Sequence, residues 1–375
     1  MKKLKKVILY LLSFLLLSAV VMILFINIDP AFGGNPTAEQ KEFYQHSNNY
    51  VDGKFINEDP AELVINSSDN SSTNDDSASE AKDRNPAGPI PVSAIDWNKI
   101  KSENDSLTWF GHSAFLLSID NKKLLIDPML SPIASPVSFV GVKRYKYNED
   151  IMPHLIDKMP PIDAVFITHD HYDHLDYQSV VKLNSKASHF FVPLGVSAHL
   201  VRWGIPKEKI TELNWWEETE YKGLTVALTP ARHFSGRDPF NIDTTLWGGW
   251  AILGNKTRLY TSGDTGYGTH FKGIGKEYGP FDITLIEGAQ YDQSWPDIHM
   301  VPEQSIQANL DVNGKTMMLM HWGAFTLANH GWNEPIERAL KEAKKRGINI
   351  IAPEIGETVL LDSDLHIPST SWWDF

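Results

Sequence analysis

The sequence predicts an α/β fold preceded by an apolar N-terminal helix, and three observations support this. From Leu107 onward, short β-rich runs alternate with helical patterns, which is typical of α/β domains. Residues 7–26 are apolar and uncharged, and all 12 tryptophans lie beyond residue 91, which places the core in the later part of the chain. At 375 residues and 42% hydrophobic content, the chain can bury a sizeable core in one or two domains.

Charge and cysteine content exclude several classes of function. The formal net charge of −13 argues against a nucleic-acid partner, because nucleic-acid surfaces need clustered Lys and Arg. The chain has no cysteine, so thiolate metal sites, disulfides and cysteine nucleophiles are excluded. Any metal ion must therefore bind to imidazole and carboxylate groups.

Residues 1–29 are expected to be an uncleaved, single-pass anchor in the cell membrane. The uncharged run from Val7 to Ile26 is about the length that a helix needs to cross a ~30 Å hydrocarbon core. A cleaved signal peptide has a shorter apolar region followed by a small-x-small site. Four lysines precede the run, which predicts a cytoplasmic N-terminus and an extracytoplasmic domain.

Three further segments are expected after the anchor. Residues 30–65 form a juxtamembrane segment with scattered apolar side chains that can pack against a folded domain. Residues 66–91 consist largely of Ser, Asn and Asp, which predicts a flexible acidic linker through which the domain reaches the membrane surface. The folded domain is then expected over residues 92–375.

The elements of that domain follow in order. LTWFGHSAFLLSI and KKLLIDP, separated by Asp120-Asn121, predict a hairpin. Residues 163–167 predict a buried strand, and LTVALTPARH, TRLYTSGDT and TMMLMHWGAF each predict an apolar strand that ends in a polar cluster. One helix is expected to start at Pro302, and a second has Pro335 in its first turn and Gly347 as its stop.

The ends of four predicted strands carry seven candidate metal ligands. The motif THDHYDH at residues 168–174 follows the strand at 163–167, and single candidates follow the other three strands. The candidates are His169, His171, Asp173, His174, His233, Asp264 and His321. Five imidazoles and two carboxylates suit two Zn²⁺ ions, with Fe or Mn as alternatives, whereas Mg²⁺ and Ca²⁺ prefer oxygen. Two such ions can share a hydroxide and hold a phosphodiester or ester for attack.

The motif HDHYDH matches the His-x-His-x-Asp-His signature of the metallo-β-lactamase superfamily. WFGHSAFLL, LIDPMLSPIASP, TPARHFSGR, TLWGGW, SGDTGY, HMVPEQ and HWGAFTLANH resemble, in order, the blocks of the N-acylphosphatidylethanolamine-hydrolysing phospholipase D family. The resemblance implies an αββα four-layer sandwich with the site at one edge between the sheets. It also implies a phosphodiesterase of phospholipase D type that acts on N-acylphosphatidylethanolamine-like membrane lipids through a metal-bound hydroxide.

Carried over by position, the resemblance implies two groups of ligands. The first metal has His169, His171 and His233; the second has Asp173, His174 and His321; Asp264 bridges the two. Asp173 and His299 are implied as catalytic, with His299 contacting substrate or assisting proton transfer. The chain departs from the animal enzymes of the family at residues 287–291, where Glu-Gly-Ala-Gln-Tyr stands in place of an apolar Pro-Ile-Gly-Ala-Tyr. Substrate contacts of that segment are not carried over.

Two other functions stay open. The first is a lactonase or ester hydrolase with a small soluble substrate, and the second is a non-catalytic, metal-stabilised binding module. The complete set of ligands argues against the second.

Several residues near the motif have two interpretations. His112 is expected to hold a backbone carbonyl, and Asp176 either orients a ligand imidazole or begins a helix. His299 is alternatively a neighbour of the helix cap. The segment from Met129 to Val142 is a candidate lid near the bilayer. A set of tryptophans either belongs to the core or lines an acyl groove: Trp215, Trp216, Trp247, Trp250, Trp295 and Trp322.

Overall fold

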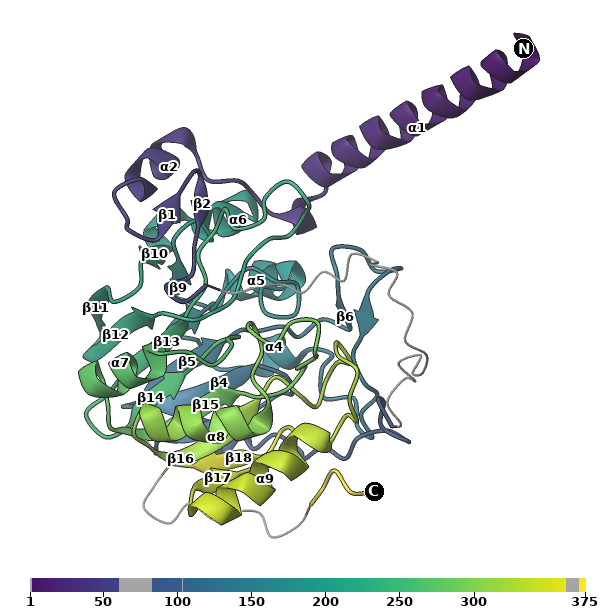
Figure 1. The fold of residues 1–375 in the computed structure, drawn as a ribbon. Helices are drawn as coiled ribbons and strands as arrows, with labels where there is room; N and C mark the ends of the chain where they lie inside the picture. The colour runs from purple at the N-terminus through teal and green to yellow at the C-terminus, as the bar shows by residue number, and fades with distance from the viewer. Residues whose placement is uncertain (1, 61–82, 103, 362–370) are drawn as a thin grey trace.

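The computed structural model describes residues 2–60, 83–102, 104–361 and 371–375. Within this part, two seven-stranded mixed sheets form the centre of the molecule (Figure 1). The strand order of the first sheet is β10 (Ile210–Leu213), β9 (Phe190–Pro193), β8 (Ala164–Phe166), β5 (Lys122–Ile126), β4 (Phe115–Ile119), β3 (Ser106–Trp109) and β18 (Thr358–Leu360). The order of the second is β11 (Glu218–Tyr221), β12 (Leu224–Thr229), β13 (Gly249–Leu253), β14 (Arg258–Thr261), β15 (Phe281–Glu287), β16 (Gly314–Met320) and β17 (Asn349–Ile351).

The sheets pack face to face, and helices cover both outer faces. Along β4, Phe115 and Leu117 belong to the central core together with Trp250 of the second sheet, whereas Leu116 belongs to a separate core on the outer face. This alternation is the period-2 pattern of a strand that is buried on both sides. The predicted αββα four-layer sandwich is therefore confirmed.

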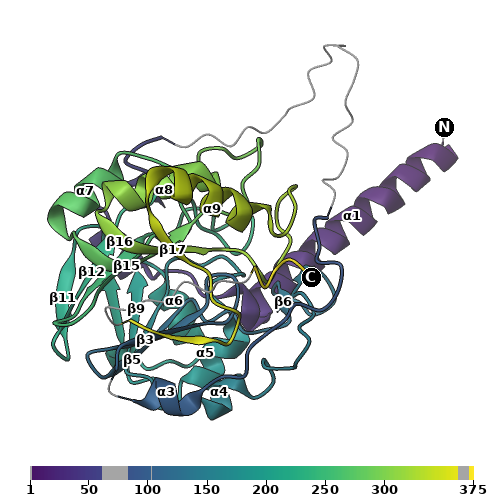
Figure 2. The ribbon, with the colours of Figure 1, turned by 90° about the horizontal axis from the view of Figure 1, so that it is seen from below.

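Figure 2 shows the two helical layers on opposite sides of the sheets. The first layer comprises α3 (Trp97–Lys101), α4 (Leu155–Lys158), α5 (Tyr177–Leu183) and α6 (Ser197–Arg202), followed by the 3₁₀ turn η2 (Lys207–Lys209). The second comprises α7 (His270–Glu277), α8 (Pro302–Asp311) and α9 (Glu334–Arg346). The predicted start at Pro302 is confirmed, and α9 ends at Gly347, whose φ of 68° is the left-handed conformation that favours glycine.

The predicted hairpin is present as β4 and β5, with Asp120 and Asn121 both at positive φ in the two-residue turn. The first half of the predicted pair is not a single strand. It divides into β3 and β4, because Gly111 and His112 adopt φ values of 84° and 57° and turn the chain between them. This turn places His112 at the edge of the sheet.

The N-terminal helix α1 (Lys2–Ile28) projects away from the sandwich (Figure 1). Its segment Lys3–Ile28 is the one helix in the described ranges that is long and apolar enough to cross a membrane, with mean hydropathy 2.9 and no buried share. This helix suggests membrane anchoring, and its exposure is unlike that of a core helix.

The juxtamembrane segment packs on the sandwich. It contains the 3₁₀ turn η1 (Pro30–Phe32), α2 (Ala38–Tyr44), β1 (Tyr50–Val51) and β2 (Lys54–Phe55). Tyr44, Tyr50 and Phe55 are buried and belong to the central core cluster. Their rings pack together, with centroids 4.8–5.7 Å apart.

The predicted linker, residues 66–91, lies outside the described residues as far as residue 82. From Asp83 the chain contacts the sandwich: Ile90 is fully buried and pairs with Tyr147, and Val92 pairs with Ile355. Residues 30–60 and the chain from Asp83 onward both contact the sandwich. The distance between α1 and the domain is therefore set by residues 30–60 and not by the segment that joins these two parts. A short hairpin of β6 (Ile133–Ala134) and β7 (Val142–Lys143) completes the described strands.

Candidate metal centre

The four predicted strand ends meet at one edge of the sandwich. The motif at residues 168–174 follows β8, His233 follows β12, Asp264 follows β14 and His321 follows β16. Strands β14, β15 and β16 are parallel neighbours, so their carboxyl ends lie at the same edge of the second sheet. The fold therefore brings together all seven side chains that the sequence singled out.

Three imidazoles form the first group. His169 Nε2 lies 3.0 Å from His171 Nδ1, and His233 Nε2 lies 3.2 Å from the same atom. Three ring nitrogens therefore surround a space that can hold one metal ion. Burial and the neighbouring imidazoles lower the pKa of His169 and of His233 well below the ordinary value. Neutral imidazole is the form that binds a metal.

The second group combines two imidazoles with a carboxylate. His174 Nε2 lies 3.4 Å from His321 Nε2, and these two atoms lie 3.5 and 3.7 Å from Asp173 Oδ2. The ring of His112 joins this group, with Nε2 2.8 Å from Asp173 Oδ2. The expectation that the His112 ring holds a backbone carbonyl is therefore wrong, because the ring holds the carboxylate of Asp173.

Asp264 lies between the two groups. Its Oδ2 is 2.6 Å from His321 Nε2 and 3.1 Å from His174 Nε2 on one side. On the other side it is 3.8 Å from both His169 Nε2 and His233 Nε2. One carboxylate oxygen is thus within reach of ligands from both groups, as a bridging position requires.

The unpaired atoms and the charges of the cluster fit bound cations. Asp264 Oδ1 is buried and has no hydrogen-bond partner among the described residues, which is costly without an ion. Burial lowers the pKa of His174, but Asp264 and Asp173 outweigh burial and raise it well above the ordinary value. The carboxylates therefore favour positive charge at this point, which a bound metal ion would supply. The cluster has the donors that a metal-dependent hydrolase needs.

Asp127, which the sequence analysis did not select, orients a candidate ligand. It follows β5, and its Oδ2 lies 2.8 Å from His174 Nδ1 and accepts a hydrogen bond of 2.6 Å from Thr168 Oγ1. The proposed orienting role of Asp176 is not observed. Asp176 is the N-cap of α5, where it accepts hydrogen bonds from the backbone of Gln178 and Ser179. A polar residue at the end of an apolar strand was the signal that would have identified Asp127.

Asp170 lies between the first two histidines of the motif, and its buried side chain holds the loop of residues 168–174 in place. Its carboxylate is buried and accepts hydrogen bonds from Gly236 N (2.7 Å) and Thr245 Oγ1 (2.8 Å), and lies 3.1 Å from His199 Nε2. His199 Nδ1 in turn accepts a hydrogen bond of 3.0 Å from Gly34 N, in the segment that follows the C-terminal end of α1. The motif therefore contacts the juxtamembrane segment through one imidazole.

His299 lies beside the cluster, with ring centroids 5.1 Å from His233 and 5.2 Å from His321. Its Nδ1 is 2.7 Å from Glu287 Oε1, and Met300 N donates to Glu287 Oε2 at 3.1 Å. Burial and Asp264 raise the pKa of Glu287 well above its ordinary value, and burial lowers the pKa of His299 to about 3. Through this contact Glu287 fixes the orientation of the His299 ring.

Most of the tryptophans considered for an acyl groove belong to the core. Trp215, Trp247, Trp250 and Trp322 are buried, so the groove interpretation is wrong for these four. Trp250 Nε1 donates to Ile167 O at 3.0 Å and thereby supports the residue before the motif.

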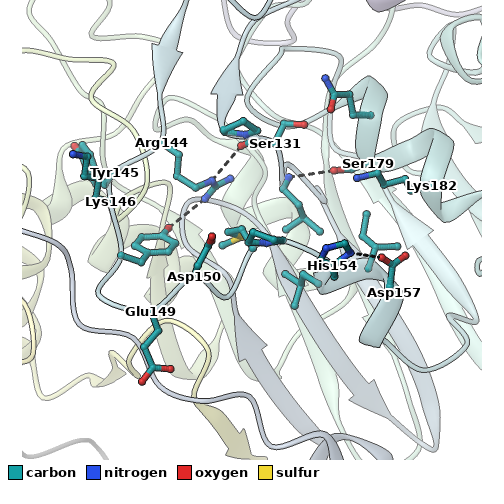
Figure 3. Close-up of a pocket in the computed structure, with 18 of the residues that line it drawn as sticks. Ser131, Arg144, Tyr145, Lys146, Glu149, Asp150, His154, Asp157, Ser179 and Lys182 are labelled. Carbon is teal, nitrogen blue, oxygen red and sulfur yellow. Dashed lines mark hydrogen bonds and ion pairs between the residues drawn. The ribbon is translucent and has the colours of Figure 1, made fainter.

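One large cavity lies apart from the cluster. It has a volume of about 610 Å³ and is lined by residues that include Arg144, Tyr147, His154 and Lys182 (Figure 3). None of the seven candidate ligands lines it. Arg144 donates to Met129 O at 2.5 Å and to Ser131 O at 3.3 Å, which fixes the loop that follows Asp127. The cavity therefore lies next to the loop that follows Asp127 and is separate from the candidate metal centre.

Comparisons with known proteins give the same assignment. Residues 122–322, more than half of the chain, match the model of the beta-lactamase superfamily domain. An uncharacterized protein of Mycobacterium tuberculosis is 40% identical over 349 residues, covering 92% of each chain. An N-acyl-phosphatidylethanolamine-hydrolyzing phospholipase D of Caenorhabditis elegans is 33% identical, covering 64% of this chain and 69% of its own.

Among solved structures, a metallo hydrolase from the archaeon Ignicoccus hospitalis superposes with a TM-score of 0.51 at 26% identity, covering 68% of this chain and 97% of its own. Fold, convergent His and Asp side chains, and sequence similarity all agree. The chain belongs to the metallo-β-lactamase superfamily of metal-dependent hydrolases, and within it resembles the N-acylphosphatidylethanolamine-hydrolysing phospholipases D.

Proposed function

We propose that this hydrolase is a dinuclear phosphodiesterase that releases the head group of N-acylphosphatidylethanolamine-like membrane lipids. The observation that carries the proposal is the position of Asp264 Oδ2 between two groups of three ligands. His169, His171 and His233 would hold one ion, and Asp173, His174 and His321 the other. Two Zn²⁺ ions fit this donor set, with Fe or Mn as alternatives. When bound, such ions activate water for attack and stabilise the charge on phosphoryl oxygens.

The chain's own residues fix the geometry of this centre. Asp127 and His112 hold the side chains of His174 and Asp173, and Ile298 O lies 3.1 Å from His233 Nδ1. Such outer contacts set the tautomer and direction of ligand imidazoles. His171, Asp173 and His299 are the partly exposed members of the centre, so substrate enters on their side.

His299 is proposed to donate a hydrogen bond to the leaving group of the substrate. With Glu287 protonated, its hydroxyl donates to His299 Nδ1, so the ring N–H lies on Nε2 and can donate a hydrogen bond to the substrate. The buried Glu287 stands in a segment that is apolar in the animal enzymes of the family, so the role of this pair is not carried over from them.

Glu287→Leu is expected to lower kcat by about 10- to 100-fold, the range typical for loss of a residue that orients an active-site imidazole. Glu287→Gln is expected to stay much closer to the parent, because its amide still donates to His299 Nδ1 and its carbonyl still accepts from Met300 N. Steady-state kinetics with metal content measured in parallel check this. Equal losses in the two variants would show that Glu287 does not act through its hydrogen bond.

The lipid class rests on two observations. The nematode relative is named for hydrolysis of N-acyl-phosphatidylethanolamine. The exposed helix α1 suggests that the domain lies at a membrane, where such a substrate is found. A lactone or a soluble ester remains the alternative substrate.

The proposed function is tested with the full-length, zinc-loaded chain in vesicles that contain N-acylphosphatidylethanolamine. We expect release of the N-acylethanolamine head group by the parent and none by His169→Ala. Short-chain esters and lactones are offered in parallel. Turnover of those compounds without lipid hydrolysis, by protein shown to hold two ions, would assign the site to the alternative class.

A further inference from the structure

The C-terminal end of α1 and the residues directly after it, residues 27–31, are here called the foot of α1. Side chains at the end of α6 and in the loop after His233 hold this foot on the domain. Arg202 donates to the backbone oxygens of Asn27 (2.7 Å) and Asp29 (3.2 Å). Trp203 Nε1 donates to Pro30 O at 2.6 Å, and Arg237 Nη2 donates to Ala31 O at 2.8 Å. The last turn of α1 therefore has a defined position relative to the sandwich.

Two loops flank this foot. The first joins β6 to β7, and the second spans residues 236–242 and carries Arg237. A small cavity is lined jointly by Ala31, Arg237 and residues 135–138, so the two loops and the foot of α1 are neighbours. Figures 1 and 2 both place β6 on the side of the domain from which α1 projects.

The two loops expose large apolar side chains. Phe139 is 80% exposed and Val140 61%, in the loop between β6 and β7. Phe240 is 67% exposed and Ile242 44%, in the second loop. Exposed apolar side chains that gather in one region mark interaction sites.

We propose that Phe139, Val140, Phe240 and Ile242 form a bilayer-contact surface around the foot of α1. The surface contacts the face of the lipid bilayer. A membrane-spanning α1 ends at Ile28, directly beside the residues that are bonded to the domain, and therefore places these two loops at the boundary between lipid and water. The net charge of −13 argues against attraction through basic residues, so apolar side chains supply the contact. The active-site loop is thereby held at a fixed height and orientation above the lipid, since Arg237 also donates to Asp170 O at 2.6 Å.

The chain has no cysteine, so a single label can be placed at any position of the full-length protein. Phe139→Cys, Phe240→Cys and the control Lys345→Cys each carry a polarity-sensitive fluorophore in phosphatidylcholine vesicles. Lys345 has a side chain that is 73% exposed and lies on α9, away from α1 (Figure 1). Substitution at such exposed positions is not expected to disturb folding.

Labels at residues 139 and 240 are expected to shift to shorter emission wavelength and to lose intensity when the lipids carry acyl-chain spin labels, and the label at residue 345 to do neither. Quenching at 139 and 240 no stronger than at 345 would overturn the proposal. Protection from aqueous iodide without quenching by spin-labelled lipid would overturn it too, because it would show a protein partner on this surface. The readout is independent of catalysis, so inactivity towards the proposed substrate does not affect the result.

Discussion

Replacing Asp264 by asparagine is expected to remove both metal binding at the bridging position and nearly all hydrolytic activity. Asparagine has the shape of aspartate but lacks its charge, and the substituted atom is the one within reach of ligands from both groups. Loss of an outer-shell partner typically costs about 10- to 100-fold. Loss of a shared ligand is expected to cost at least about 100-fold in activity and to lower the metal content from two ions per chain.

Metal analysis and kinetics of the purified variant measure both effects. Asp282→Asn is the matched control, because it makes the same chemical change in β15 at a surface pair with Lys315 and should leave both quantities at the parent level. Removal of metal from the parent by a chelator should reproduce the loss of activity, and addition of Zn²⁺ should reverse it. Full activity of Asp264→Asn with two bound ions would disprove the bridging role.

Asp127→Asn separates the role of a ligand from that of its support. The carboxylate of Asp127 orients the His174 ring through its Nδ1 atom and is not itself among the candidate metal ligands. Its replacement should therefore reduce affinity for the second ion more than the maximal rate at saturating metal. Asp264→Asn should not recover in this way, because added metal cannot replace a missing ligand.

The sequence predicts which side chains the fold brings together, because the candidate ligands follow one rule. Each of His233, Asp264 and His321 comes at the end of an apolar strand, and parallel strands bring such ends to one edge of a sheet. The same rule applies to Asp127 after β5 and to Glu287 at the end of β15. Those two were not selected because a single buried carboxylate has no spacing motif, and its partners lie on other strands.

The contacts of the N-terminal segment were beyond prediction for a different reason. Asn57 Oδ1 accepts a hydrogen bond from His233 N, and Asn57 Nδ2 donates to His233 O, across 176 positions of sequence. Gly34 reaches His199 across 165 positions. A composition of scattered apolar residues indicates that such a segment packs, but no periodicity identifies its partner. The structure shows that these residues extend the support of the centre to the foot of α1.

A protein that begins at Asp83 is expected to fail to fold, whereas one that begins at Asp29 is expected to fold without α1. The shorter chain lacks Tyr44, Tyr50 and Phe55, which are all buried in the central core. Loss of three such side chains costs roughly 4.5–9 kcal/mol at about 1.5–3 kcal/mol each. That range is comparable with the ~5–15 kcal/mol by which most domains are stable.

Thermal unfolding and metal content of the two proteins distinguish the outcomes. The protein from Asp29 should unfold cooperatively and bind metal, and the protein from Asp83 should be aggregated or show no transition. Asn57→Ala in the longer protein removes the two hydrogen bonds with His233 and the one from Trp247 Nε1. This loss should cost about 1–3 kcal/mol by leaving a buried backbone group unpaired. Equal melting temperatures for the two truncated proteins would show that residues 29–60 are an appendage. A large difference would establish that the segment leading from the membrane helix is part of the folded enzyme, and that a domain expressed without it cannot report on the activity of the chain.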